Sequence, residues 1–195
     1  IVGSETFNGS LFLLPKDCRL TEFTLEGISN IQGDFQCIDY FYVKEFVMPF
    51  IRVAGDMTIA LNSGSVNTAA EIEFPKLQEI GGTLTLGTNR NANNITFPLL
   101  KKILGSCSVT TYKLKNDIEF TNLESIGTDG ADAQIKFEIE ATNILCPKLK
   151  TINGKFDIAT SSFMFDMEVD KVSYPNVESI SENLSITCPY SDFGS

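Results

Sequence analysis

The fold is decided by one stretch of the sequence, Ile72-Glu-Phe-Pro75-Lys-Leu77-Gln-Glu-Ile80-Gly-Gly82-Thr-Leu84-Thr-Leu86. The same motif recurs with substitutions at residues 95–109, 144–158 and 172–186, and weaker copies begin at residues 23, 46 and 118. The position of Pro75 recurs at 26, 49, 98, 121, 147 and 175, at intervals of 23 to 28 residues. Seven copies with a nearly constant period indicate a repeat architecture.

Each copy ends in alternating apolar and polar residues, as in Leu84-Thr85-Leu86, which is the period of a strand with one buried face. Proline in mid-phrase breaks a helix and cannot donate to a strand ladder, so it suits a bend between strands. The glycine after the Ile80 position is expected where a turn requires positive φ or where the coil bends sharply. A unit of 23 residues cannot bury its apolar side alone, so the units must stack.

The sequence therefore predicts an all-β fold, a parallel β-helix or solenoid of about seven coils, with the coils ~4.8 Å apart. One apolar position per copy is expected to form a buried ladder along the stack: Ile31, Val53, Ile80, Ile103, Ile126, Ile152 and Ile180. We expect one domain over residues 1–195, with an N-terminal cap at 1–19, the repeats at 20–188 and a tail at 189–195.

The composition argues against several functions. Fifteen Lys and Arg against 25 Asp and Glu give a net charge of −10, which disfavours nucleic acid and anionic lipid as partners. The absence of His removes Ser-His-Asp triads, Cys-His pairs and His-ligated zinc. The sequence has no apolar run long enough to predict a transmembrane helix. We also expect no cofactor. The segment Thr128–Asp132 is short of oxygen ligands, so a solvated loop is favoured over a Ca²⁺ site, and no metal site is expected.

The five cysteines, at 18, 37, 107, 146 and 188, contain no CxxC motif. Cys37 and Cys107 occupy apolar strand positions, and Cys146 occupies the position of Phe74. The cysteines are therefore interpreted as small buried hydrophobic residues. A disulfide between Cys18 and Cys37 is the alternative, and a reactive thiol is disfavoured because no basic cluster lies nearby.

Two rows of outward positions differ in character. One row alternates in charge toward its end and is interpreted as a solvated surface that fixes the register of the coils: Ser29, Arg52, Gln78, Lys101, Glu124, Lys150 and Glu178. The other row is small and mostly uncharged: Gln36, Thr58, Thr85, Ser108, Asp157 and Ser185. Because short polar side chains let a partner approach the backbone closely, we hypothesise that this second row is a recognition face. The alternative is that such residues merely suit a crowded parallel sheet.

The phrase Phe-Pro-x-Leu-x-x-Ile-x-Gly-x-Leu-x-Leu, as it stands at residues 74–86, resembles the receptor L domain family. These relatives of the leucine-rich repeats occur in insulin- and EGF-receptor ectodomains. Very similar phrases occur in fungal GPI-anchored wall proteins and in surface lipoproteins of gut Bacteroidetes. The resemblance covers residues 20–188 and implies a right-handed, leucine-rich-repeat-like β-solenoid placed outside the cell. The receptors flank this domain with Cys-rich modules, and nothing in this sequence is similar to one.

The resemblance also implies binding without catalysis. We therefore expect a non-enzymatic binding or adhesion module, secreted or at the cell surface, that recognises an extracellular protein or a glycan. We expect no nucleic-acid partner and no membrane insertion of this segment, with any lipid anchor lying in a segment outside this chain. A structural surface spacer is one alternative. A polysaccharide-cleaving β-helix enzyme is another, and it would need paired acids such as Glu73 and Glu119.

Overall fold

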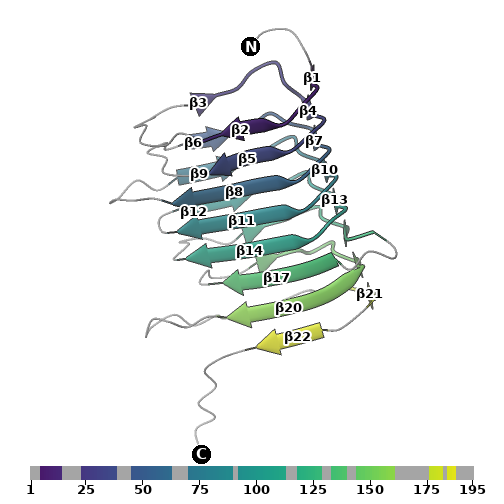
Figure 1. Ribbon diagram of the computed structural model, residues 1–195. Helices are drawn as coiled ribbons and strands as arrows, with labels where there is room; N and C mark the ends of the chain where they lie inside the picture. The colour runs from purple at the N-terminus through teal and green to yellow at the C-terminus, as the bar shows by residue number, and fades with distance from the viewer. Residues whose placement is uncertain are drawn as a thin grey trace, which may run out of the picture.

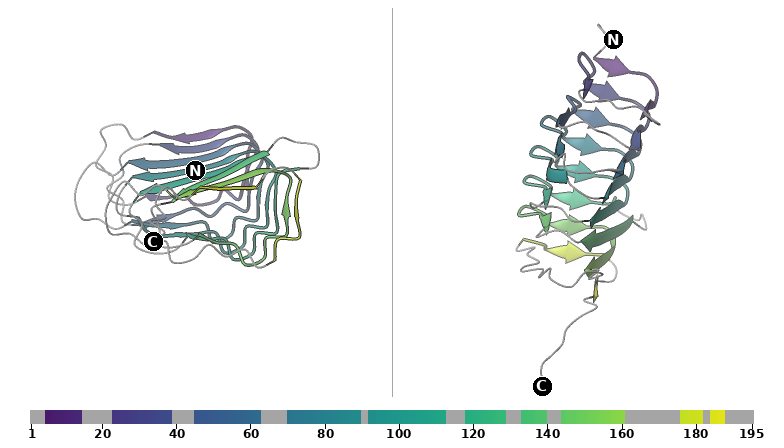
Figure 2. Two further views of the ribbon diagram at one scale, coloured as in Figure 1. Left: turned by 90° about the horizontal axis from the view of Figure 1, so that it is seen from below. Right: turned by 90° about the vertical axis from the view of Figure 1, so that its left-hand side faces the viewer.

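The computed structural model describes residues 5–14, 23–38, 45–62, 70–89, 92–112, 118–128, 133–139, 144–160, 176–181 and 184–187. These residues form an all-β parallel β-helix, in which each strand pairs in parallel with strands of the neighbouring coils. The strands stack from the N-terminal to the C-terminal end of the molecule (Figure 1). Seen along the stack, successive coils lie over one another (Figure 2). No described segment forms a helix long and apolar enough to cross a membrane.

The coil is built from three sheets, through which the chain passes in the order C, A, B. Sheet A contains β1 (Thr6–Phe7), β4 (Asn30–Ile31), β7 (Arg52–Val53), β10 (Glu79–Ile80), β13 (Lys102–Ile103), β16 (Ser125–Ile126), β19 (Thr151–Ile152) and β21 (Ser179–Ile180). Sheet B contains β2 (Leu11–Leu13), β5 (Phe35–Ile38), β8 (Met57–Asn62), β11 (Leu84–Asn89), β14 (Cys107–Tyr112), β17 (Ala133–Ile139), β20 (Gly154–Thr160) and β22 (Leu184–Thr187). Sheet C contains β3 (Phe23–Thr24), β6 (Glu45–Val47), β9 (Ala70–Glu73), β12 (Ala92–Thr96), β15 (Ile118–Glu119) and β18 (Ile144–Leu145).

The number of strands differs between the sheets. The sequence predicts about seven coils, whereas the described strands number eight in sheet A, eight in sheet B and six in sheet C, so the sheets do not share one count. Residues 1–19, expected as a cap, contain β1 and β2, which are the first strands of sheets A and B. The expected tail at 189–195 lies outside the described residues.

The predicted isoleucine ladder is confirmed. Its members occupy one register along sheet A, from Ile31 to Ile180, and Phe7 of β1 extends it by one position. The six members from Ile31 to Ile152 are fully buried, and Ile180 is partly buried. Burial of one such side chain contributes about 1.5–3 kcal/mol, so the ladder is a large part of what holds the coils together.

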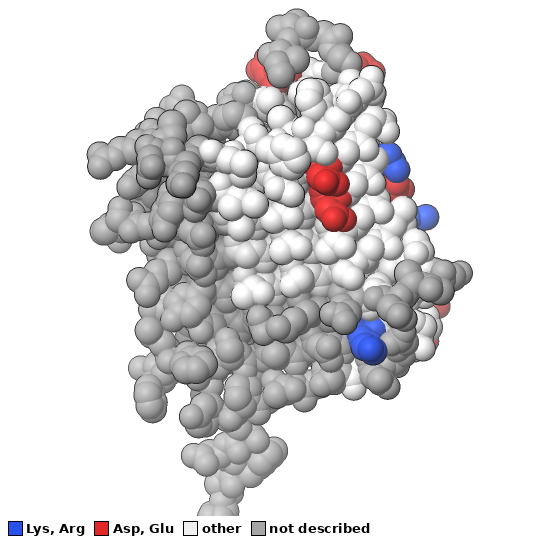
Figure 3. All heavy atoms as spheres, in the orientation of Figure 1, with Lys and Arg blue, Asp and Glu red and all other residues white. Residues whose placement is uncertain are grey.

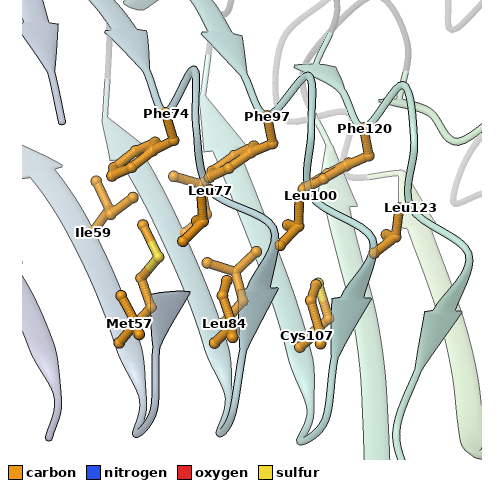
Figure 4. Close-up of a cluster of buried hydrophobic side chains, with 14 of the residues drawn as sticks. Met57, Ile59, Phe74, Leu77, Leu84, Phe97, Leu100, Cys107, Phe120 and Leu123 are labelled. Carbon is orange, nitrogen blue, oxygen red and sulfur yellow. The ribbon is translucent and has the colours of Figure 1, made fainter. Parts of the chain in front are cut away.

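A second ladder runs through the bend between sheets C and A. The rings of Phe74, Phe97 and Phe120 stack at centroid separations of 5.1 Å with nearly parallel planes. Leu77, Leu100 and Leu123 lie beside them in the core (Figure 4), and all six side chains are fully buried. Pro75 and Pro98 lie in this bend, between the inward-facing phenylalanine and the inward-facing leucine of their coils.

A glycine recurs two residues after the isoleucine ladder. In most coils the reason for it is not the positive φ that the sequence suggested. Among the described glycines two residues after the isoleucine ladder, only Gly154 has positive φ, and Gly127, which also has positive φ, lies one residue earlier in its coil. At Gly55, Gly82 and Gly105 a Cβ atom would lie only 2.7–2.9 Å from the carbonyl carbon of the glycine one coil earlier. The amide of Gly82 donates to the carbonyl oxygen of Gly55 (2.9 Å), and Gly105 donates likewise to Gly82. These glycines are needed because neighbouring coils touch backbone to backbone.

The charged row on sheet A needs one correction. Arg52 does not align with Gln78 but with Glu79, because the copy that begins at residue 46 is one residue shorter. Its guanidinium Nε lies 2.8 Å from the Glu79 carboxylate, and Ile51 takes the position beside Gln78. Farther along the row, Lys150 and Glu178 form the expected ion pair between coils, at 3.7 Å. The Lys150–Glu178 pair is exposed and the Arg52–Glu79 pair is still about one-third accessible to solvent, so each contributes little to stability.

Candidate recognition face

The hypothesised recognition row forms a continuous line along the outer side of sheet B. Gln36 pairs with Thr58, Thr58 with Thr85, and Thr85 with Ser108 in adjacent strands. The backbone positions of Asp157 and Ser185 continue the same register on β20 and β22. Gln36, Thr58, Thr85 and Ser108 are half-buried, while the side chains of Asp157 and Ser185 lie outside the described part of the structure.

Two members of the line were missed by the sequence interpretation. Phe12 of β2 pairs with Gln36, and its ring is 50% exposed. Lys136 of β17 holds the register position between Ser108 and Asp157. The alternation in Leu11-Phe12-Leu13 and in Ile135-Lys136-Phe137 is the signal that could have found them.

A second outward line beside the first contains two positions with little or no side chain, Ala60 and Gly87. Ile38, Ala60, Gly87 and Thr110 pair in adjacent strands beside the first line. A Cβ atom on Gly87 would meet nothing nearer than the Ile59 carbonyl oxygen at 4.0 Å, and Gly87 does not have positive φ. Neither contact with the next coil nor backbone conformation therefore requires glycine at this position.

The face carries little charge in its described part, apart from one small acidic spot and one small basic spot nearer the C-terminal end of the stack (Figure 3). Asp34 and Asp56, which precede β5 and β8, have structural partners. Asp34 Oδ1 accepts the amide N–H of Asp56 (2.9 Å), and Asp56 Oδ1 accepts that of Thr83 (2.7 Å). Ser10 Oγ accepts the amide of Asp34 in the same way, so these side chains bind each coil to the next.

From Gln36 to Ser108 the chemistry of the face is that of hydrogen bonding without charge, whereas Lys136 and Asp157 are charged positions farther along the same line. Hydroxyl groups donate and accept, and the amide of Gln36 does both as well. The acids weighed for an enzyme lie elsewhere: Glu73 and Glu119 are on sheet C, in one register with Thr96 between them. Within the described residues no three His, Cys, Asp or Glu side chains gather to hold a metal ion. Residues 129–132 of the loop considered for Ca²⁺ lie outside the described chain.

The described cysteines are buried in the core, as predicted. Cys37, Cys107 and Cys146 have no exposed surface and are free thiols, so the alternative of a Cys18–Cys37 disulfide is not adopted. Burial raises the pKa of the Cys37 and Cys107 thiols to about 12. Burial, and to a smaller extent the nearby Cys107, raises the pKa of Cys146. Cys18 and Cys188 lie outside the described residues.

We expect Cys37, Cys107 and Cys146 to resist a thiol reagent at pH 8 in the folded protein and to react after unfolding, because the thiolate is the reactive form. Since their folded pKa lies above the unfolded value of about 8.5, they reduce stability as pH rises from there toward 12. Peptide mass spectrometry after pulsed labelling measures each site. Labelling of any of the three as fast as in the denatured chain would contradict this assignment.

No protein-family model, curated protein or solved structure matches this chain.

Proposed function

We propose that this chain is a non-catalytic binding module, secreted or displayed at the cell surface, which recognises an extracellular protein or a glycan through the outer side of sheet B. The proposal includes the finer fold assignment: a right-handed solenoid of about seven coils like that of receptor L domains. The resemblance of residues 74–86 to that family supports the handedness and the placement outside the cell. Parallel strands joined by a crossover are right-handed in nearly all known sheets, which also supports the handedness.

The observation that carries the proposal is the row of short side chains on the outer side of sheet B. Thr58, Thr85 and Ser108 present short polar groups at the strand spacing of ~4.8 Å. Beside them, Ala60 and Gly87 leave the backbone open to close approach. The core does not need a glycine at position 87, whereas a partner pressed against the sheet would benefit from one.

The test is the double substitution Thr85→Arg and Ser108→Arg, which places two long cations in the centre of the face. Binding to a ligand identified on a glycan array or an extracellular-protein array should weaken at least about tenfold, or ~1.4 kcal/mol. The matched control is Thr96→Arg, which adds an arginine at a half-buried outward position of sheet C. Circular dichroism confirms that the variants fold.

The controls separate the proposal from its alternatives. Unchanged binding by the double variant would remove this face as the recognition surface. Equal weakening by Thr96→Arg would place the contact on sheet C. A chain that binds nothing on either array would favour the structural spacer. Release of reducing sugars from polysaccharides would instead favour the enzyme.

A further inference from the structure

The outer side of sheet C is acidic. One outward line along the stack consists of residues that pair in adjacent strands: Val47, Glu73, Thr96, Glu119 and Leu145. Two positions earlier in the strands, Glu45 pairs with Glu71. The described strands of sheet C contain no lysine or arginine. We call the five paired residues from Val47 to Leu145 the acidic line.

The bend between sheets C and A is basic, and so is the outer side of sheet A beside it. Between residues 46 and 152, the acids in these two regions are Glu79 and Glu124. The cations there outnumber them: Arg52, Lys76, Lys101, Lys102, Lys148 and Lys150. In a chain with a net charge of −10, a surface of the opposite sign is a local feature that overall composition does not explain.

Three of these lysines have no ion partner in the described part of the chain. Lys76, Lys101 and Lys102 are exposed, and no described residue forms an ion pair with any of them. Glu79 lies beside Lys102 in the adjacent strand but is bound by Arg52 at 2.8 Å. The three ammonium groups can therefore attract an anionic surface, over a distance of about 8–10 Å at physiological salt.

Exposed aliphatic side chains accompany both charged surfaces. Ile51 (37% exposed) and Leu99 (43%) lie among the cations, and Val47 (38%) belongs to the acidic line. Removal of such side chains from water favours association in addition to any charge attraction. We call the surface formed by Ile51, Lys76, Leu99, Lys101 and Lys102 the basic bend.

The two surfaces share the repeat of the stack. Glu73 and Glu119 lie two coils apart on the acidic line, with Thr96 between them. On the basic bend, Lys101 lies one coil beyond Gln78, the residue two positions after Lys76. Since coils are ~4.8 Å apart on both surfaces, two copies with aligned stack axes can form the same kind of contact at several levels.

We infer that copies of this chain associate side by side, with the acidic line of one copy against the basic bend of the next. Glu73 and Glu119 of one copy face the three unpaired lysines of the other, and the exposed aliphatic residues pack between them. Exposed ion pairs contribute only about 0.2–1 kcal/mol each, and the net charge of −10 opposes association, so the assembly is weak and reversible. The contact leaves the outer side of sheet B uncovered, so it does not depend on the proposed recognition by that face.

Sedimentation velocity of the whole 195-residue chain at increasing concentration tests the inference. The mean mass of the wild-type chain should rise with concentration. The double substitution Lys101→Glu and Lys102→Glu should weaken association at least about tenfold, because both surfaces are then acidic. The double substitution Glu73→Lys and Glu119→Lys should weaken it as much, because both surfaces are then basic. An equal mixture of the two double variants should recover association, since the acidic bend of one meets the basic line of the other.

The net charge separates this local contact from overall repulsion. Each substitution changes the charge by two, so the first double variant has a net charge of −14 and the second has −6. If overall repulsion alone governed association, the second variant would associate more strongly than the wild type. That result would overturn the inference, as would a wild-type chain that stays monomeric at every concentration, or a mixture no more associated than its two components. Circular dichroism confirms that both variants fold.

Discussion

Replacing Phe97 by Ala is expected to lower the free energy of unfolding by about 3–5 kcal/mol. The Phe97 ring is fully buried and lies between the rings of Phe74 and Phe120, with centroids 5.1 Å from each. Its removal leaves a cavity and abolishes two stacked contacts, each worth about 0.5–1.5 kcal/mol beyond burial. Because a neighbouring coil lies on either side, the backbone cannot collapse to fill the space.

The measurement is urea unfolding of Phe97→Ala beside Leu99→Ala. Leu99 lies two residues farther along the chain but is 43% exposed, so its truncation should change stability by no more than about 0.5 kcal/mol. The melting temperature of Phe97→Ala should fall by about 6–20 °C for a chain of this size. A loss below about 1 kcal/mol would show that the stacked rings do not hold the coils together.

Gly105→Ala is expected to cost about 3 kcal/mol or more, although it adds a single methyl group. The new Cβ would lie 2.7 Å and 2.8 Å from the carbonyl carbon and oxygen of Gly82, and 2.9 Å from the amide nitrogen of Thr83. All three atoms belong to the backbone of the preceding coil, so no side chain can rotate away. The two coils must separate locally, which strains the hydrogen bond between Gly105 and Gly82.

Gly87→Ala is the matched control for this prediction. Its Cβ would meet nothing nearer than 4.0 Å and its backbone φ is not positive, so alanine should be neutral or stabilise by up to about 1 kcal/mol. Thermal unfolding of the two variants should therefore differ by about 6–16 °C in midpoint. Equal melting temperatures would mean that the glycine position tolerates a side chain and that the coils are less closely spaced than in the structure.

The strand positions and the core residues could be predicted because the sequence pattern within each repeat determines them. Alternation in Leu84-Thr85-Leu86 and the spacing from Pro75 to Ile80 specify which side chains turn inward, whatever the neighbouring coil contains. The isoleucine ladder and the line through Thr58, Thr85 and Ser108 followed from this.

The sequence interpretation was wrong or incomplete where a residue's role depends on contacts with a neighbouring coil. Arg52 was placed beside Gln78 because a copy shortened by one residue can be aligned in two ways, and only the strand pairing decides for Glu79. The role of Gly82 could not be deduced from one repeat, since it depends on the distance to Gly55 in another. The strands within residues 6–13 were missed because that segment keeps the Phe7 to Leu11 spacing but lacks the phrase of the other copies.

The in-register pairing of the coils has a consequence for how such a molecule can change in length. Residues 75 and 98 occupy equivalent positions one coil apart, and the 23 residues from one to the other make a complete turn of the chain. Loss or duplication of that segment would rejoin equivalent residues and shorten or extend the rod by ~4.8 Å. The length of the stack can therefore change by one coil at a time, while its cross-section stays the same.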